Sequence, residues 1–291
     1  MGVEQTKVVI PSAGLGTRLL SATKEQPKEM LPMFASDNHG ILSIAPLVQL
    51  VFEQLFDCGL REFYFIVGKG KRAIEDHFAP DHEFLNRLLV RGKKSQASHL
   101  DAFYRKIESS MIVWVNQPEP RGFGDAVLQA KHLMTEEPFL LHAGDTFIKS
   151  RTESIPTRLA QAYARTQAEV TLALQEVEDP RQYGVAEVVP TALGDLEVKK
   201  VVEKPAEPTS KLAIMPLYLL KPIIFEALEA TPPDKGGEVQ LTDAIQKLIA
   251  TGHNVRAIKL REDDIRLDIG TPETYWEALE ISHRYALSEA R

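Results

Sequence analysis

The sequence predicts an α/β fold in which helices flank a mixed, mainly parallel central sheet. Short β-branched and aromatic runs alternate along the first half of the chain with stretches whose apolar residues recur at helical spacing. This alternation indicates βαβ units, whose strands lie parallel in one sheet. A loop with Gly14 and Gly16 directly follows the first run, and ligands of such sheets bind beyond the carboxyl ends of the strands.

The first half of the chain supplies the expected parallel strands and their helices. The predicted strands are 8–10, 63–67, 111–115 and 139–141, and the predicted helices are 46–56, 71–78 and 124–134. Because parallel strands end at one edge of a sheet, the following loops should bring Gly14, Gln117 and Asp145 together. Residues 80–110 are polar and charged, so we expect an inserted helical or mobile segment there, not a domain.

The second half continues the alternation with more hairpin character. The predicted helices are 155–166, 241–250 and 272–288, and the predicted strands are 170–177, 185–189, 197–202, 212–220 and 255–260. Strands 185–189 and 197–202 should pair around the turn 191–195. Thr242 is a candidate cap for its helix, and Pro272 suits a first helical turn.

Composition excludes several classes of protein. The 34 Lys and Arg residues against 41 Asp and Glu residues give a net charge of −7, which argues against a dedicated nucleic-acid binder. Hydrophobic residues make up 44%, enough for a sizeable core. No apolar run approaches the roughly 20 residues of a membrane span, and Cys58 is the single cysteine. We therefore expect a cytoplasmic protein with no nucleic-acid or membrane partner.

The loop 11–19 has the composition of an anion-binding turn. Gly14 and Gly16 allow backbone N–H groups to approach an anion closely. The loop lacks the Gly-Lys-Ser/Thr ending of a Walker A motif, and Leu19 stands where a dinucleotide fingerprint requires a third glycine. A plain strand-to-helix turn would explain the two glycines equally well.

Charged residues near this loop and at two strand ends could serve a phosphorylated ligand. Arg18, Lys24 and Lys28 could neutralise a triphosphate, although a solvated charged stretch is the simpler explanation. Asp145 and Asp268 each follow an apolar step, where a carboxylate can hold Mg²⁺. Each aspartate could instead only form an Asx turn or a helix cap.

Taken together, these segments resemble the sugar-nucleotide pyrophosphorylases, which are nucleotidyltransferases acting on sugar 1-phosphates. The resemblance lies in Gly14-Leu15-Gly16-Thr17-Arg18 and in Pro27-Lys28-Glu29-Met30-Leu31-Pro32. Four further segments, 117–127, 183–185, 202–205 and 237–245, are similar to the bacterial-type branch that joins UTP to glucose 1-phosphate. The resemblance covers roughly residues 7–285.

The resemblance implies a Rossmann-like nucleotide-binding fold and a set of site residues. One nucleotidyltransferase domain would span 1–291, with 1–150 mainly binding nucleotide and 151–291 mainly binding sugar and forming C-terminal helices. The implied nucleotide contacts are Ala13, Gly14, Gly16, Gln117 and Gly122, the last two at the uracil edge. The implied catalytic residues are Arg18, Lys28 and Asp145, the sugar-phosphate contacts are Gly184, Glu203 and Lys204, and the Mg²⁺ ligands are Asp145 and Asp268.

The activity implied by this resemblance is Mg²⁺-assisted, in-line transfer of uridylyl from UTP to glucose 1-phosphate by a homodimer or homotetramer. A thymidylyltransferase or an enzyme of broad specificity is the nearest alternative, because a single methyl group gives only about 1–3 kcal/mol of discrimination. A catalytically silent regulatory subunit that binds sugar nucleotide is the alternative of another class. Leu19 and the lysines that follow disfavour a nicotinamide-dependent oxidoreductase.

Overall fold

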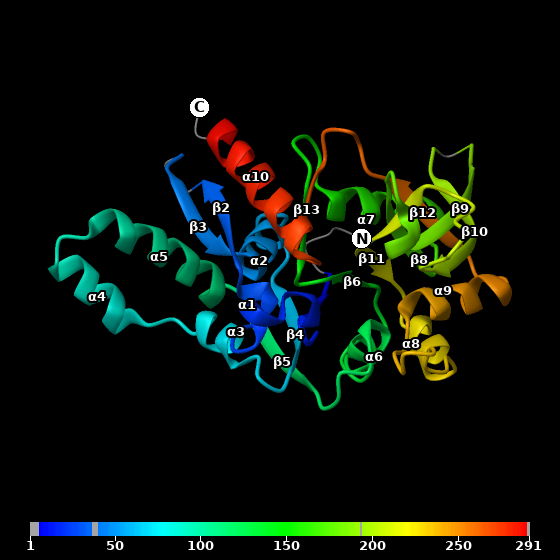
Figure 1. The fold of residues 1–291 in the computed structure, drawn as a ribbon, viewed down its shortest axis with the longest axis horizontal. Helices are drawn as coiled ribbons and strands as arrows, with labels where there is room; N and C mark the ends of the chain where they lie inside the picture. Colours follow the sequence, from blue (N-terminus) through cyan, green and yellow to red (C-terminus); the bar gives the residue numbers. More distant parts are fainter. Residues whose placement is uncertain (1–5, 37–39, 193, 290–291) are drawn as a thin grey trace.

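A nine-stranded sheet forms the centre of the molecule (Figure 1). The computed structural model describes residues 6–36, 40–192 and 194–289. In spatial order the strands are β5 (Met111–Gln117), β4 (Glu62–Gly68), β1 (Val8–Pro11), β6 (Phe139–His142), β11 (Leu212–Leu220), β8 (Val170–Glu176), β12 (Val255–Lys259), β10 (Leu196–Glu203) and β9 (Gly184–Pro190).

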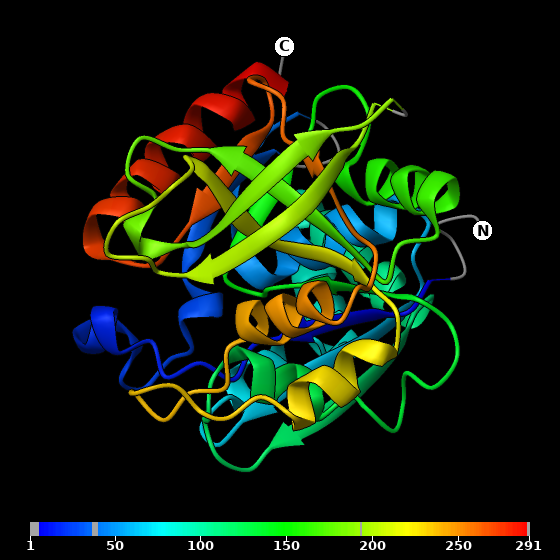
Figure 2. The same ribbon diagram turned by 90° about the vertical axis from the view of Figure 1, so that its right-hand side faces the viewer.

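The sheet is mixed, as the sequence predicts. Strands β5, β4, β1 and β6 are parallel neighbours, and β8 pairs in parallel with β12. Strand β11 joins the two parts by pairing antiparallel to both β6 and β8. Strands β9 and β10 form the predicted hairpin, and β9 also pairs with β11 (Figure 2), so this half of the sheet curls back on itself.

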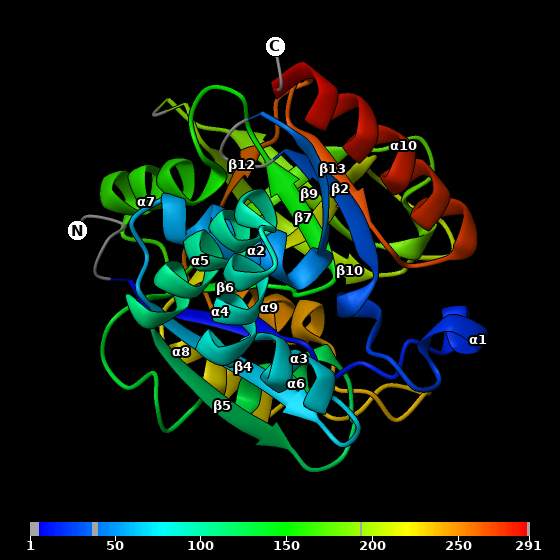
Figure 3. The same cartoon turned by 90° about the vertical axis from the view of Figure 1, so that its left-hand side faces the viewer.

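Helices cover both faces of the sheet. The longer helices are α2 (Leu47–Asp57), α5 (Lys94–Glu108), α7 (Ile155–Thr166), α9 (Leu241–Ala250) and α10 (Pro272–Glu289); the shorter ones are α1 (Leu20–Thr23), α3 (Arg72–His77), α4 (His82–Val90), α6 (Phe123–Leu128) and α8 (Ile223–Glu229). Helices α2 and α5 lie in front of the sheet in Figure 3. Val8 and Ile10 share a buried cluster with residues of α2, α5 and α7, whereas Val9 shares one with residues of α6, α8 and α9. The strand alternation therefore divides the core into two apolar layers.

Within the described part of the chain, two smaller sheets and three short 3-10 helices complete the fold. The small sheets pair β2 (Pro32–Ser36) with β3 (Leu42–Pro46) and β7 (Thr146–Lys149) with β13 (Ile265–Asp268), and the 3-10 helices are η2 (Thr17–Leu19), η3 (Lys28–Met30) and η4 (Pro180–Gln182). Helix α10 packs against β2 and β13. In the described ranges no helix is long and apolar enough to cross a membrane.

Residues 80–110 form α4 and α5, which project from the body of the protein in Figure 1. The prediction of an inserted helical segment is confirmed. The two helices contact each other, and buried Phe103 and Ile107 of α5 attach the pair to the core.

Two sequence-based expectations are wrong in detail. The helix predicted over 124–134 ends at Leu128, because the next turns use i→i−3 hydrogen bonds such as Lys131 N to Leu128 O at 3.1 Å. Buried Ala130 and Met134 keep an apolar spacing that resembles a longer helix. Thr242 does not cap α9: Gln240 occupies the N-cap, and Thr242 lies inside the first turn.

Candidate active site

The carboxyl ends of β1, β5 and β6 border a cavity of about 530 Å³. Strands β9, β10, β11 and β13 and the start of α9 close its other side. All candidate site residues line this cavity: Ala13, Gly14, Gly16, Arg18, Lys28, Gln117, Gly122, Asp145, Gly184, Glu203, Lys204 and Asp268. The expected proximity of Gly14, Gln117 and Asp145 follows from their place at one sheet edge.

The glycine loop folds over the cavity next to a lysine. Gly16 has φ 65° and is the N-cap of η2, and the Thr23 hydroxyl holds the loop by donating to Gly16 O at 2.8 Å. A Cβ on Gly14 would lie 3.7 Å from Lys28 Cε. The loop backbone and the Lys28 ammonium therefore face the same volume, which suits an anionic group.

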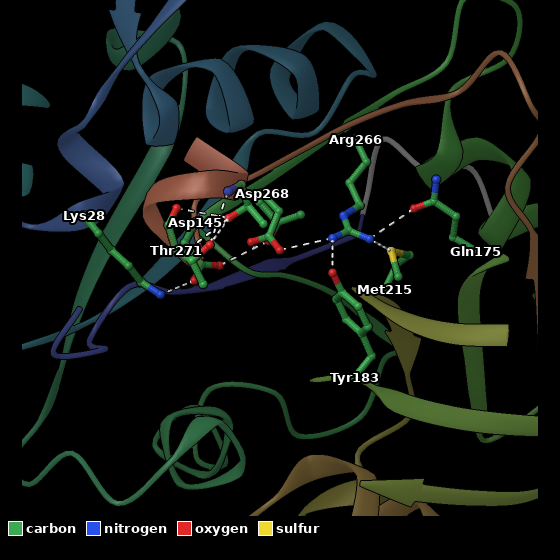
Figure 4. Close-up of polar contacts among 10 residues, drawn as sticks. Lys28, Asp145, Gln175, Tyr183, Met215, Arg266, Asp268 and Thr271 are labelled. Atoms are coloured by element: carbon green, nitrogen blue, oxygen red, sulfur yellow. Dashed lines mark hydrogen bonds and ion pairs between the residues drawn. The ribbon is translucent and has the colours of Figure 1, made fainter. Parts of the chain in front are cut away.

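Lys28 and Asp145 form an ion pair at the wall of the cavity (Figure 4). Burial alone would lower the pKa of Lys28, but the carboxylates of Asp145 and Glu29 raise it above its usual value. Burial would raise the pKa of Asp145, and the Lys28 ammonium outweighs that effect and lowers it. Both side chains are therefore charged at neutral pH.

Asp268 lies close to this pair and is held by Arg266 (Figure 4). Arg266 Nη2 donates to Asp268 Oδ2 at 3.1 Å and to the Tyr183 hydroxyl at 2.7 Å. Burial, followed by the negative charge of Asp145, raises the pKa of Asp268 even though Arg266 opposes the shift. The two aspartates thus concentrate repelling negative charge at one point of the cavity wall.

A buried ion pair anchors the segment that carries Lys28. Glu29 is 1% exposed, and its Oε2 accepts from Lys71 Nζ at 2.9 Å. Burial raises the pKa of Glu29, although Lys71 and Lys28 oppose that shift. The pair connects η3 to the loop after β4 and so fixes where Lys28 points.

Another wall of the cavity is formed in part by the Gln117 side-chain amide and the backbone of Gly122. Gln117, at the end of β5, donates from Nε2 to Gly122 O at 3.3 Å. Gly122 has φ 101°, and a Cβ there would lie 2.9 Å from backbone atoms of Val239. Only glycine fits this conformation and this close approach.

The β9–β10 hairpin contributes a third group of polar side chains. Gly184 and Glu203 are register partners, and a Cβ on Gly184 would lie 3.2 Å from Glu203 Oε2. The Thr242 hydroxyl donates to Glu203 Oε2 at 2.7 Å, and Lys204 Nζ lies 3.2 Å from Glu203 Oε1. Glu203 therefore presents a fixed carboxylate to the cavity beside an exposed ammonium.

Pro216 sits at an irregularity of β11 that borders the cavity. The pairing of β11 with β8 shifts register between Met215 and Tyr218, which is a bulge. Proline has no N–H to donate, and it is tolerated there because a bulged position does not have to donate to the ladder. Its carbonyl accepts from Ala143 N at 3.0 Å, so the bulge still joins β11 to the end of β6.

Sequence reasoning missed several residues that build this site. One of them is Arg266, which holds the predicted Asp268. The two residues are two positions apart on β13 and therefore share a face, a period of two that the sequence contains. Lys71 lies far from Glu29 in sequence, and no local pattern indicates that pairing. The sequence predicts only a capping role for Thr242, whereas in the structure its hydroxyl orients Glu203.

Comparison with known proteins places the chain in a family. Residues 7–284 match the Nucleotidyl transferase family, and the chain belongs to it. It is 40% identical over 247 residues to a putative UTP–glucose-1-phosphate uridylyltransferase of Methanocaldococcus jannaschii, covering 84% of this chain and 82% of that protein. It is 34% identical over 284 residues to the UTP–glucose-1-phosphate uridylyltransferase of Pseudomonas aeruginosa, covering 96% of both.

Solved structures agree with these relatives. A UDP-glucose pyrophosphorylase complexed with UDP-glucose superposes with a TM-score of 0.81 at 30% identity, covering 96% of this chain and 99% of that one. The family and the nucleotide-binding α/β fold inferred from the sequence are therefore confirmed. The resemblance to uridylyltransferases is also confirmed.

Proposed function

We propose that this protein transfers a uridylyl group from UTP to glucose 1-phosphate, giving UDP-glucose and pyrophosphate. The observation that carries the proposal is one cavity that joins a glycine loop, the cations Arg18 and Lys28, and the carboxylates Asp145 and Asp268. The relatives named UTP–glucose-1-phosphate uridylyltransferase, at 34–40% identity, support this choice of substrates.

The proposed metal is Mg²⁺, held by Asp145 and Asp268. The carboxylates fit a hard divalent cation because Asp145 raises the pKa of Asp268, a repulsion that such a cation would relieve. Two protein carboxylates leave room for phosphate and water oxygens, as magnesium sites usually do. When bound, Mg²⁺ would neutralise phosphate charge and orient the two substrates.

The proposed reaction is one in-line displacement. A phosphate oxygen of glucose 1-phosphate forms a bond to the α-phosphorus of UTP, and the bond from that phosphorus to the bridging oxygen breaks. Pyrophosphate leaves with the electron pair. The attacking phosphate is already anionic, so no general base is required.

The chain's own cations oppose the repulsion between the two substrates. Lys28, whose pKa is raised by the carboxylates beside it, would place its ammonium on the α-phosphate. Arg18 is exposed at the cavity and would meet the leaving phosphates, and Lys204 would bind the sugar phosphate. Preorganised charges of this kind are the main source of rate in such transfers.

The wall that carries Gln117 would select the base, and the wall formed by the β9–β10 hairpin would select the sugar. The proposed nucleotide contacts are Ala13, Gly14, Gly16, Gln117 and Gly122, and the proposed glucose contacts are Gly184 and Glu203. Residues 1–150 would then mainly bind nucleotide and residues 151–291 sugar. A cytoplasmic location and a homodimer or homotetramer stay predictions from the sequence.

The test is a substrate grid with Mg²⁺. UTP, dTTP, CTP, ATP and GTP are each paired with glucose, galactose and N-acetylglucosamine 1-phosphates, and pyrophosphate release and sugar-nucleotide product are measured. We expect UTP with glucose 1-phosphate to dominate. A preference for dTTP would overturn the substrate assignment, and no transfer by folded protein that binds UTP would favour a regulatory binder.

A further inference from the structure

The side-chain amide of Gln117 is held in one orientation. Its Nε2 donates to Asp125 Oδ2 at 2.7 Å and to Gly122 O at 3.3 Å. A carboxylate and a carbonyl only accept, so both contacts require the NH₂ group on that side. The amide oxygen, Oε1, must therefore point the other way.

Gln117 Oε1 is left available to a ligand. Among the described residues, none donates a hydrogen bond to this oxygen. This oxygen has no partner among the residues that the structure describes and yet is not fully buried, so part of its surface is accessible. Gln117 borders the cavity. An acceptor therefore faces the cavity at this wall.

Asp125 is built to hold Gln117 without touching the ligand. It is 2% exposed, lies in the first turn of α6 and does not border the cavity. Its Oδ1 accepts from Arg121 Nη2 at 3.0 Å, while Oδ2 faces Gln117. Gln129 Nε2 also donates to Oδ2, at 3.5 Å. Both carboxylate oxygens therefore have donors, which hold the side chain against rotation.

The backbone around this contact is fixed by close packing. Val239 N donates to Arg121 O at 2.8 Å, and Gly124 N donates to Val239 O at 2.9 Å. A Cβ on Gly124 would lie 2.7 Å from Val239 O. The segment that carries Asp125 therefore cannot shift to let Gln117 turn.

We propose that Asp125 is a positioning residue that sets base specificity by locking Gln117 with its oxygen toward the nucleobase. This inference rests on the proposed function, because it assumes that a pyrimidine nucleotide binds beside Gln117. Uracil and thymine present an N3–H donor, which pairs with the Gln117 oxygen. Cytosine presents an unprotonated N3 acceptor there, which leaves two acceptors facing each other.

The decisive variants remove the lock without altering Gln117. In Asp125→Ala the acceptor is gone, and in Asp125→Asn the single amide oxygen can face Arg121 or Gln117 but not both. The amide can then turn its NH₂ group toward cytosine N3. We expect the ratio of kcat/KM for UTP over CTP to fall at least about tenfold in both variants, roughly 1.4 kcal/mol.

The matched control is Arg121→Gln. It removes the exposed partner of Asp125 and keeps the carboxylate against Gln117, so the UTP over CTP ratio should stay within about twofold of the wild-type ratio. A merely structural role of Asp125 would lower kcat/KM for both nucleotides together and leave the ratio unchanged. An unchanged ratio in both Asp125 variants, with circular dichroism and melting like wild type, overturns the inference.

The outcome can be separated from the proposed function. If wild-type protein transfers from UTP and the Asp125 variants keep its ratio, only the inference fails. If wild-type protein transfers from neither nucleotide, the proposed function fails, and calorimetric Kd values for UTP and CTP replace kcat/KM. If the ratio of the Kd values for CTP and UTP is then the same in wild type and in the Asp125 variants, the inference fails as well.

Discussion

The buried pair of Glu29 and Lys71 offers a sharp test of how the site is held. In Lys71→Met, the Glu29 carboxylate loses its partner at 2.9 Å while staying 1% exposed. Removing one member of a buried pair costs about 3–5 kcal/mol. With an unfolding entropy of about 2 cal/mol/K per residue over 291 residues, this corresponds to a melting point lower by about 5–8 °C.

The pH dependence of this loss identifies its cause. Burial already raises the pKa of Glu29, and removing Lys71 raises it further. A carboxyl whose pKa is higher in the folded state contributes fully to stability at a pH below its unfolded-state pKa. This contribution to stability is lost as the pH rises through the folded-state pKa. The cost of Lys71→Met should therefore be smaller at pH 5 than at pH 8.

Urea unfolding followed by circular dichroism at both pH values measures this effect. The double variant Glu29→Gln/Lys71→Met is the matched control, and it should recover at least about 1 kcal/mol at pH 8 because position 29 no longer carries an unpaired buried charge. A cost below about 1 kcal/mol at pH 8, or one that is equal at both pH values, would refute the reasoning.

Three further predictions concern other parts of the molecule. Lys28→Met should lower kcat/KM about 10²- to 10³-fold in steady-state assays with circular dichroism unchanged, because one charge on the reacting phosphates is lost; a near wild-type rate would remove Lys28 from catalysis. Burial lowers the pKa of His142 from 6.5 to about 4, so its contribution to stability should fall by about 2 kcal/mol from pH 8 to pH 5. In urea unfolding, His142→Gln should not show this loss of stability between pH 8 and pH 5. The same loss in the variant and in wild type would contradict a role of His142 in it. Gly122→Ala should destabilise the protein by about 1–3 kcal/mol and raise KM for UTP, because Gly122 has φ 101° and a Cβ there would lie 2.9 Å from backbone atoms. Gly70→Ala should cost less, because Gly70 has φ 85° but open space around it. Melting curves and steady-state kinetics compare the two variants.

Much of the fold follows from local patterns in the sequence. Helix 155–166 has a Ser154 cap, a proline in its first turn and an apolar face, and the structure reproduces it to the residue. The strands of the first half were predicted because buried parallel strands form continuous apolar runs. Helix α6 was predicted too long because buried turns after Leu128 keep the same spacing of apolar residues.

The site was predictable where short segments carry it and not where distant residues meet. Gly14 and Lys28 stand in one compact stretch, and Asp145 follows a strand, so their convergence follows from sheet topology. The contacts of Asp125 with Gln117, and of Lys71 with Glu29, depend on side chains that only the folded chain brings together. The sequence contains these residues but no period that links them.

The most direct test of the central claim is isotope exchange between labelled pyrophosphate and UTP. If both anions meet in the cavity and react in one displacement, label enters UTP only when glucose 1-phosphate and Mg²⁺ are present. The account predicts exchange with the sugar phosphate and none without it. Label entering UTP in the absence of sugar phosphate would reveal a covalent nucleotidyl-enzyme and contradict the account, as would no exchange in the complete mixture.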